Sequence, residues 1–542
     1  MAEIVSAEKA AEMIPDDAVV GVAGMGLSGW PEEVACAIRD RFAKTGHPQN
    51  LNLKQNSAMG DWGFGNQFYG WEKNKREEPL ENEGARGVTR FGEAGTGLIK
   101  RWTSAHIGSA FSLNSLARKN LIDAHCIPQG VAINLWREIA AGRPGLLTKV
   151  GLGTFVDPRL EGGRMNEYED PEEVVRYVNF EGEDYLFYPA FSCDVALLRG
   201  TIADENGNIS FEKESVMNEG FSVATATKNS GGIVIVQVEY LAKKESLNPK
   251  DVKIPGNLVD YVVVASDPMA SWQAEGTYFQ PAFSGHIRVP LEKIKPMELD
   301  ERKVICRRCA MELKKGNLIN LGVGMPASIA SVVAEEGLLD EVTMSTESGM
   351  VGGMPSALPN FGSAYNPESI LTPGDMFDLI NGGGLDVTCL GIGEVDQYGN
   401  NNVSKMGTRL TGPGGFIDIT TSTKTVIFAG TLMGKAKLQI KDGEIKVLEE
   451  GTIKKFVKDV DQITFSAKYS PESQKVMYVT ERAVFELKNG ELVLVEIAPG
   501  LDLEKDVLQC MDFQPKIGPN LKTMDERLFC ETWGELDRFI EK

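Results

Sequence analysis

The chain has 542 residues, a length that favours two domains, because single hydrophobic cores stop growing at about 250–300 residues. Hydrophobic residues make up 42% of the chain and charged residues 25%, which is typical of a folded globular protein. The formal net charge of −21 argues against nucleic acid or an anionic membrane as a partner, because both are bound through clustered lysine and arginine.

The amino-terminal segment, MAEIVSAEKAAEMIPDD, has acidic residues where a signal peptide needs a basic and then an apolar stretch. No segment approaches the roughly 20 apolar residues of a membrane-spanning helix. We therefore expect a cytoplasmic protein with no membrane partner.

The two halves of the chain repeat each other weakly, but in the same order. VVGVAGM (19–25) matches INLGVGM (319–325), and each copy has the pattern of an apolar strand that runs into a glycine turn and a helix. LNLKQNSAM (51–59) matches VTMSTESGM (342–350). The order of the matches predicts two copies of one structural plan.

A third match joins DVALLRGTIADENGN (194–208) to DVTCLGIGEVDQYGN (386–400). The first half carries a long insertion between its second and third motif. The aspartates that align are Asp194 with Asp386 and Asp204 with Asp396.

Strands alternate with helical patterns in both halves, which predicts an α/β protein with two related open, largely parallel sheets. We expect an amino-terminal domain over residues 1–267, which holds the insertion, and a crossover linker over 268–298. A carboxyl-terminal domain is expected over 299–542.

Metal chemistry is not indicated. The chain has eight cysteines and four histidines, and its one C-x-x-C pair, Cys306 and Cys309, lacks a second pair at zinc-site spacing. The two thiols are expected one turn apart on an amphipathic helix. No H-x-x-H or H-E-x-x-H motif occurs, so we predict neither a metal nor a histidine-based nucleophile relay.

Glu347 lies between a strand-like run and a series of glycines in TMSTESGMVGGMP. A solvated position is the ordinary expectation for a glutamate. Here VTMST alternates like a strand, and the glycines that follow cannot form a good helix interior. We therefore expect Glu347 at the carboxyl edge of a parallel sheet, where ligands bind in open α/β folds. The repeat places Asn56 opposite Glu347, so only one copy has the carboxylate.

Longer stretches carry a family resemblance. ESGMVGGMP, FGSAYNPESI, FDLINGGGLDVTCLGIGEVDQYGNNNVSKMG and GGFIDIT resemble the carboxyl-terminal half of class I CoA-transferases. DDAVVGVAGMGLSGWPEEV, IPQGV, TKVGLGTFVDPR, DYLFYPAF and NSGGIVIVQVEYL are similar to the α-type half of that family. The branch that the chain resembles most contains the propionate/lactate and acetate CoA-transferases with fused α and β halves. The resemblance runs from residue 4 to 530, and residues 62–83 depart from it most clearly.

The resemblance implies an enzyme that transfers CoA from an acyl-CoA to a carboxylic acid, with CoA as a substrate and no separate cofactor. It implies that Glu347 is the catalytic glutamate. The carboxylate attacks the thioester to give a mixed anhydride, and the released CoA thiolate then forms a glutamyl-CoA thioester. The acceptor acid reverses these steps, so ping-pong kinetics are expected.

The resemblance also implies the residues around the reacting group. Each attack builds negative charge on a carbonyl oxygen, which requires preorganised N–H donors. The expected oxyanion and acyl-pocket residues are Gly383, Gly384, Asn56, Gly24 and Met25. The expected CoA-binding residues are Gly382, Gly383, Gly384, Lys405 and Arg409, with the two cations near the phosphates.

Departures from the family pattern bear on the substrate. Where 3-oxoacid transferases tend to have Glu-Asn-Gly and Gly-Gly-His, this chain has ESG at 347–349 and GGL at 383–385. We therefore expect short, unbranched acyl groups (acetyl, propionyl or butyryl) and short carboxylic acids as partners. Whether a 2-hydroxy acid is accepted depends on the width of the pocket.

Three other functions stay open. They are a 3-oxoacid CoA-transferase, an acyl-CoA hydrolase on the same scaffold and, least favoured, a non-catalytic ligand sensor. A homo-oligomer, either a dimer or a tetramer, is expected from the resemblance.

Overall fold

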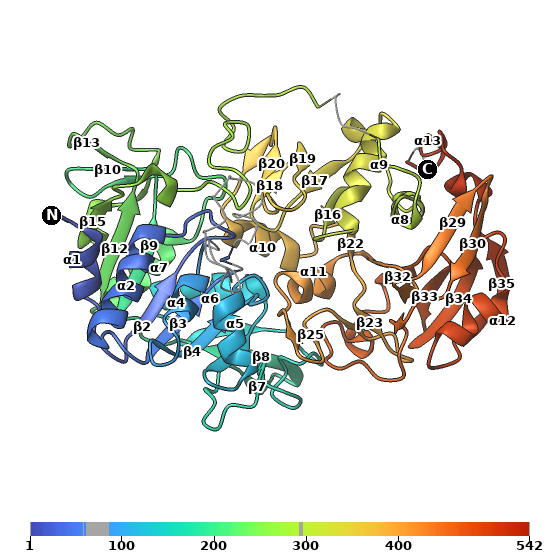
Figure 1. Ribbon diagram of the computed structural model, residues 1–542, viewed down its shortest axis with the longest axis horizontal. Helices are drawn as coiled ribbons and strands as arrows, with labels where there is room; N and C mark the ends of the chain where they lie inside the picture. The colour runs from blue at the N-terminus through green and yellow to red at the C-terminus, as the bar shows by residue number, and fades with distance from the viewer. Residues whose placement is uncertain (1, 58, 61–85, 292–295, 541–542) are drawn as a thin grey trace, which may run out of the picture.

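The computed structural model describes residues 2–57, 59–60, 86–291 and 296–540. Two large sheets, one in each half of the chain, lie in lobes that stand side by side (Figure 1). The predicted α/β fold with large parallel sheets in two domains is confirmed. The departing segment 62–83 lies outside the described residues.

The first sheet has eight strands among the described residues, all paired in parallel in the order β1-β15-β12-β9-β2-β3-β4-β5. Its central strands are apolar runs that are buried on both faces, as expected where helices cover both sides of a parallel sheet. The strands are β1 (Glu3–Val5), β2 (Val19–Val22), β3 (Leu51–Gln55), β4 (Ile99–Ser104), β5 (Asp123–Cys126), β9 (Val195–Arg199), β12 (Ile233–Val238) and β15 (Tyr261–Val264). The helices of this half are α1 (Ala7–Glu12), α2 (Glu32–Thr45), α4 (Thr89–Glu93), α5 (Phe111–Arg118), α6 (Gln129–Ala140) and α7 (Gly220–Asn229).

The second sheet has ten strands in the described part of the chain, in the order β21-β18-β17-β16-β22-β27-β32-β33-β34-β35. The strands are β16 (Leu318–Leu321), β17 (Thr343–Ser345), β18 (Met350–Val351), β21 (Ser369–Ile370), β22 (Val387–Gly391), β27 (Thr425–Ala429), β32 (Lys475–Val479), β33 (Ala483–Lys488), β34 (Glu491–Ile497) and β35 (Lys516–Thr523). The helices are α8 (Glu301–Ala310), α9 (Ile329–Glu335), α10 (Pro373–Asn381), α11 (Phe416–Ser422), α12 (Leu503–Asp506) and α13 (Asp537–Ile540).

The second sheet is less parallel than predicted. Strands β17, β16, β22, β27 and β32 run parallel, whereas β32, β33 and β34 pair antiparallel. A two-residue turn joins β33 to β34, with Asn489 at φ 54° and Gly490 at φ 75°. Asn-Gly is the preferred sequence of a tight hairpin turn, so local turn chemistry explains the antiparallel edge.

The structure repeats the plan that the sequence indicated. The strand order β12-β9-β2-β3 in the first sheet corresponds to β27-β22-β16-β17 in the second. Asp194 accepts a hydrogen bond from the Val19 N–H at 2.8 Å, and Asp386 accepts one from the Leu318 N–H at 2.8 Å. Each bond ties the start of one central strand to the start of its neighbour in the same way.

Smaller sheets surround the two large ones. In the first half, a three-stranded and a four-stranded sheet lie outside the main sheet. Their strands are β6 (Gly145–Thr148), β7 (Arg176–Phe180), β8 (Glu183–Pro189), β10 (Ile202–Asp204), β11 (Ile209–Ser210), β13 (Tyr240–Ala242) and β14 (Val252–Ile254). In the second half the short pairs are β19 (Met354–Pro355) with β20 (Ala364–Tyr365), β23 (Glu394–Val395) with β24 (Asn401–Asn402), β25 (Lys405–Met406) with β26 (Arg409–Leu410), β28 (Met433–Gly434) with β31 (Ile453–Lys454), and β29 (Lys437–Lys441) with β30 (Glu444–Glu449).

Cys306 and Cys309 both lie on α8, as predicted, but this helix is buried in the core rather than amphipathic. Among the described residues, no cluster of three or more His, Cys, Asp or Glu side chains could hold a metal ion. No helix in the described ranges is long and apolar enough to cross a membrane.

Candidate active site

Glu347 lies at the carboxyl edge of the second sheet, as predicted. It follows β17, which pairs in parallel with β16. The chain then reverses into β18 through a turn in which the Gly349 N–H donates to the Thr346 carbonyl at 3.0 Å. Gly349 has φ 114°, and a β-carbon there would lie 2.1 Å from the Leu371 carbonyl oxygen. Only glycine fits this position, so the residue fixes the turn that presents Glu347.

The Glu347 side chain is almost enclosed, because the residue is 7% exposed. Burial raises the pKa of its carboxyl, while hydrogen bonding to its own N–H and to the Asn320 amide opposes that rise. Asn320 is fully buried on β16, beside β17. A desolvated carboxylate is a stronger nucleophile than a hydrated one, so this setting suits covalent chemistry.

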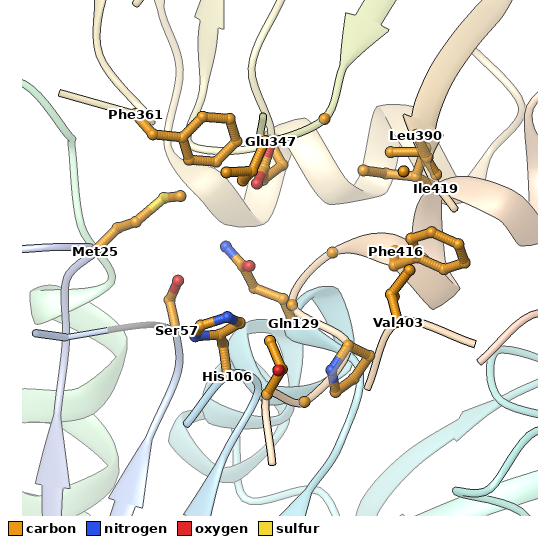
Figure 2. A pocket seen from close by; sticks show the side chains of 18 of the residues that line it. Met25, Ser57, His106, Gln129, Glu347, Phe361, Leu390, Val403, Phe416 and Ile419 are labelled. Atoms are coloured by element: carbon orange, nitrogen blue, oxygen red, sulfur yellow. The ribbon is translucent and has the colours of Figure 1, made fainter. Parts of the chain in front are cut away.

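Glu347 faces a cavity of about 210 Å³ between the two lobes (Figure 2). Residues from both sheets line it, which places the cavity where the carboxyl edges of the two sheets meet. The lining residues labelled in Figure 2 are Met25, Ser57, His106, Gln129, Glu347, Phe361, Leu390, Val403, Phe416 and Ile419.

One side of the cavity is apolar. Leu390, Val403, Phe416 and Ile419 gather there, away from the polar side chains of the first lobe (Figure 2). An apolar surface with few polar groups is the usual lining of a small-molecule site. This side offers a path for an uncharged chain towards Glu347.

The glycine loop at 412–415 also approaches Glu347 from the second lobe. A β-carbon on Gly415 would lie 3.5 Å from Glu347 Cγ. Gly415 is the residue before α11, and within the described residues its N–H makes no hydrogen bond. The Gly414 N–H, by contrast, donates to the Ala105 carbonyl at 2.8 Å. Gly415 therefore offers a free backbone donor next to the carboxylate.

The expected oxyanion donors Gly383 and Gly384 are not at the site. With Gly382 they form the end of α10, where their N–H groups donate to the carbonyls of Asp378, Ile380 and Leu379 at 2.9–3.0 Å. This turn precedes β22 and therefore lies at the amino edge of the sheet, whereas Glu347 lies at the carboxyl edge. The prediction is corrected, because the glycines terminate a helix and their donors are already used.

Asn56 is also not free to act on a bound acyl group. It is fully buried, its amide donates to Glu219 at 3.1 Å, and its side-chain oxygen accepts from Trp136 Nε1 at 2.5 Å. The neighbouring residue, Ser57, lines the cavity instead. The repeat therefore identified the correct strand end, but the side chain that faces the cavity is the next one.

The turn at Gly24 and Met25 does reach the site. Gly24 has φ 132°, and a β-carbon there would lie 2.2 Å from the Ser28 carbonyl oxygen, so the tight turn requires glycine. The Met25 side chain lines the cavity on the same side as Phe361 (Figure 2). Gly24 itself does not line it.

Lys405 and Arg409 lie on the β25–β26 hairpin. The hairpin leaves the cavity at Val403 and returns at Thr411, both of which line it. Lys405 is half-buried and borders a separate cleft, whereas Arg409 is exposed. Neither cation lines the Glu347 cavity.

Sequence reasoning missed several residues of the cavity. His106, Gln129 and Thr411 line it together with Ser57. Burial, together with the nearby charge of Arg409, lowers the pKa of His106 to about 4, so its imidazole is neutral at pH 7. The segment IPQGV, which contains Gln129 and resembles the family, is the sequence signal for this residue.

The two lobes are joined directly beneath the cavity. The Gln129 N–H, at the start of α6, donates to the Gly414 carbonyl at 3.0 Å. Asp418 on α11 is fully buried, and its carboxylate accepts the Gly130 N–H at 2.9 Å. Burial raises the pKa of Asp418 to about 7. The Asp418 carboxylate thus ties the first turn of α6 to α11, while the Gln129 N–H ties it to the glycine loop.

Known proteins resemble this chain over its full length. The caffeate CoA-transferase of Acetobacterium woodii is 57% identical over 548 aligned residues, which cover all of both chains. The acetate CoA-transferase YdiF of Escherichia coli O157:H7 is 40% identical and covers 97% of this chain and 95% of its own. The Coenzyme A transferase family model matches residues 82–265.

Solved structures agree with the fold. The apoenzyme of the acyl-CoA transferase YdiF from E. coli O157:H7 superposes with a TM-score of 0.88 at 38% identity, covering 98% of this chain and 97% of that one. A thioester complex of YdiF with CoA superposes with a TM-score of 0.86. The fold and the full-length identity define a CoA-transferase. This chain belongs to the family I CoA-transferases and carries both halves in one polypeptide.

Proposed function

We propose that Glu347 is the nucleophile of this CoA-transferase and carries CoA between two half reactions. Two buried carboxylates, Glu275 and Glu347, line the cavity. The observation that supports Glu347 is its place at the strand end, with the cavity in front of it and a free backbone N–H beside it. A carboxylate in that setting can attack a thioester, whereas no histidine relay is needed.

The first half reaction forms two bonds in succession. A Glu347 oxygen adds to the acyl-CoA carbonyl, and the C–S bond breaks to leave an acyl-glutamyl anhydride and CoA thiolate. The thiolate then attacks the glutamyl carbonyl, which releases the donor's carboxylate and leaves glutamyl-CoA thioester. The acceptor carboxylate runs both steps in reverse, so no proton, electron or water is consumed overall.

Negative charge develops on a carbonyl oxygen in each step. The Gly415 N–H is the donor that we assign to this oxygen, in place of Gly383 and Gly384, because it is unused and adjoins Glu347. Its place at the start of α11 adds little, since that helix is short. We further propose that pantetheine follows the apolar side of the cavity and that Lys405 and Arg409 approach the CoA phosphates.

The proposal also concerns which carboxylic acids accept CoA. One similar protein is named a caffeate CoA-transferase and another an acetate CoA-transferase, so acceptors of very different size occur among the relatives. A cavity of about 210 Å³ suits an acyl group rather than a whole CoA, since sites for larger ligands run from about 300 to 1,000 Å³. We propose monocarboxylic acids whose acyl group fits this space, from the acetate, propionate and butyrate class to an aromatic propenoate.

A matrix of donors and acceptors tests this function. Acetyl-, propionyl- and butyryl-CoA are each mixed with those acids among acetate, butyrate, acetoacetate and caffeate that differ from the donor's own acid, and the new CoA ester is followed. Reciprocal plots against both substrates should give parallel lines, because CoA rests on the enzyme between half reactions. Intersecting lines would contradict the covalent route, and release of free CoA without an acceptor would favour hydrolysis.

A further inference from the structure

Four polar side chains form one wall of the cavity, which we call the polar wall: Ser57, His106, Gln129 and Thr411. Figure 2 shows Ser57, His106 and Gln129 on the opposite side of the cavity from Glu347, with the Gln129 amide directed into the space between them. Phe361 and Met25 lie on another side of the cavity, and the buried Glu275, which adjoins Gly26, also lines it.

Three side chains of the polar wall lack hydrogen-bond partners. Ser57 Oγ and Thr411 Oγ1 are buried without a partner among the described residues. Gln129 is 2% exposed, and no residue in the described ranges bonds its side-chain amide. Buried polar atoms in native proteins are nearly always paired, so such orphans beside a cavity point to a ligand.

The fold holds these side chains in place through their backbones. The Ser57 carbonyl accepts Gln55 Nε2 at 2.6 Å. The Thr411 carbonyl accepts the Ile107 N–H at 2.8 Å, and Gln129 begins α6 with its N–H bonded to Gly414. The main chain of each residue is therefore fixed, while its side-chain donor or acceptor stays available.

The chemistry of the polar wall narrows what it can bind. Hydroxyl, amide and neutral imidazole groups both donate and accept hydrogen bonds, which suits a hydroxyl group. A second carboxylate, as in a dicarboxylic acid, calls for lysine or arginine, and none lines the cavity among the described residues. An unsubstituted alkyl chain would leave the polar atoms unpaired, which is unfavourable.

We propose that the polar wall is a subsite for a hydroxyl group on the acyl chain, and that the enzyme discriminates hydroxylated acids from their deoxy analogues. This inference rests on the proposed CoA-transfer function, and it adds a substrate class to it. The hydroxyl can belong to a short aliphatic acid or to a phenolic ring, and the two sources share the same hydrogen-bond chemistry.

Matched pairs of acceptors test the proposal with acetyl-CoA as the donor. One pair is 2-hydroxypropionate with propionate, and the other is caffeate with cinnamate. In at least one pair, kcat/KM should favour the hydroxylated acid by about tenfold for each hydrogen bond that it makes. The pair that shows the preference identifies the source of the hydroxyl.

Two variants connect that preference to the polar wall. Ser57→Ala and Thr411→Val should each lower the ratio of kcat/KM for the hydroxylated acid to kcat/KM for the deoxy acid by about tenfold. Ser112→Ala is the control, because its hydroxyl bonds the Thr89 carbonyl away from the cavity. This control should leave the preference at its wild-type value.

Other outcomes would overturn the proposal. Equal rates within both pairs would refute the hydroxyl subsite and leave CoA transfer intact. A loss that is the same for hydroxylated and deoxy acids would mean that the polar wall holds the reacting carbonyl of every substrate. If wild-type enzyme transferred CoA to no acid at all, the proposed function itself would fail.

Discussion

Asp418 in the second lobe accepts a hydrogen bond from the backbone N–H of Gly130 in the first lobe, at 2.9 Å. The packing there is so close that a β-carbon on Gly130 would lie 2.5 Å from both Asp418 Oδ1 and Phe377 Cδ1. The adjoining Gln129 N–H bonds the glycine loop that carries Gly415. One buried carboxylate therefore joins the start of α6 in the first lobe to α11 in the second lobe.

This contact makes stability depend on pH. Burial raises the pKa of Asp418 to about 7, above its value in the unfolded chain, so the stability it contributes is greatest at low pH and is lost as pH rises to about 7. Asp418→Asn removes the titration. Between pH 5 and 7, the free energy of unfolding of the wild type should fall by about 2 kcal/mol relative to that of the variant. The steepest expected change is about 1.4 kcal/mol per pH unit, the value for one proton.

Urea-unfolding midpoints at pH 5, 6, 7 and 8 measure this difference. The control is Asp378→Asn, because the Asp378 carboxylate is exposed and bonds Arg137 and Asn134 on α6. This variant should differ from wild type by the same amount at each of these pH values. A constant difference between wild type and Asp418→Asn across the range would show that Asp418 does not titrate there.

Gly415 should tolerate alanine in the fold but not in catalysis. A β-carbon there would meet Ile419, Phe377 and Glu347 at 3.3–3.5 Å, which is close but not a clash. We expect Gly415→Ala to unfold at nearly the wild-type temperature and to lose roughly 10- to 100-fold in kcat, because a small displacement of the nucleophile is costly.

Gly382→Ala is the matched control, at the glycine run that the sequence favoured. Its kcat should stay near wild type, since that run ends α10 at the far edge of the sheet. The assignment of the oxyanion donor would be wrong if Gly382→Ala lost activity while Gly415→Ala kept it.

The repeat explains what the sequence could and could not predict. Paired Asp194 and Asp386 make equivalent strand-to-strand bonds, so an alignment of the two halves located the sheets and the strand end of Glu347 correctly. The choice of glycines failed because a glycine run that ends a helix and one that approaches a nucleophile have the same composition. The two kinds of glycine run are distinguished by the edge of the sheet at which they lie, which depends on whether they precede or follow a strand.

The polar wall was missed for a related reason. Its residues come from the ends of β3 and β4, the start of α6 and a loop of the second lobe, and no short motif contains them. Residues that are brought together by the docking of two lobes leave no local periodicity or spacing to detect.

Replacing Asn56 tests whether this residue has a structural role or a catalytic one. Its amide and oxygen join Glu219 to Trp136 in the core, so Asn56→Ala leaves two buried polar groups without this partner. We expect a loss of about 2–4 kcal/mol in the free energy of unfolding, with kcat per folded molecule reduced by less than about tenfold. Urea unfolding and active-site titration measure the two effects. If Asn56→Ala were as stable as wild type but lost most of its kcat, Asn56 would have the oxyanion role that the sequence predicted.

Trapping the covalent intermediate tests the central claim most directly. Enzyme incubated with acyl-CoA and no acceptor should gain the mass of CoA less water on the peptide that contains TMSTESGMVGG. Borohydride should then reduce Glu347 to an alcohol and abolish activity, whereas enzyme without acyl-CoA should resist it. Glu347→Gln should fold, take no label and lose turnover by several orders of magnitude, because an amide is a poor nucleophile. Label on any other carboxylate, or near-normal transfer by Glu347→Gln, would contradict the account.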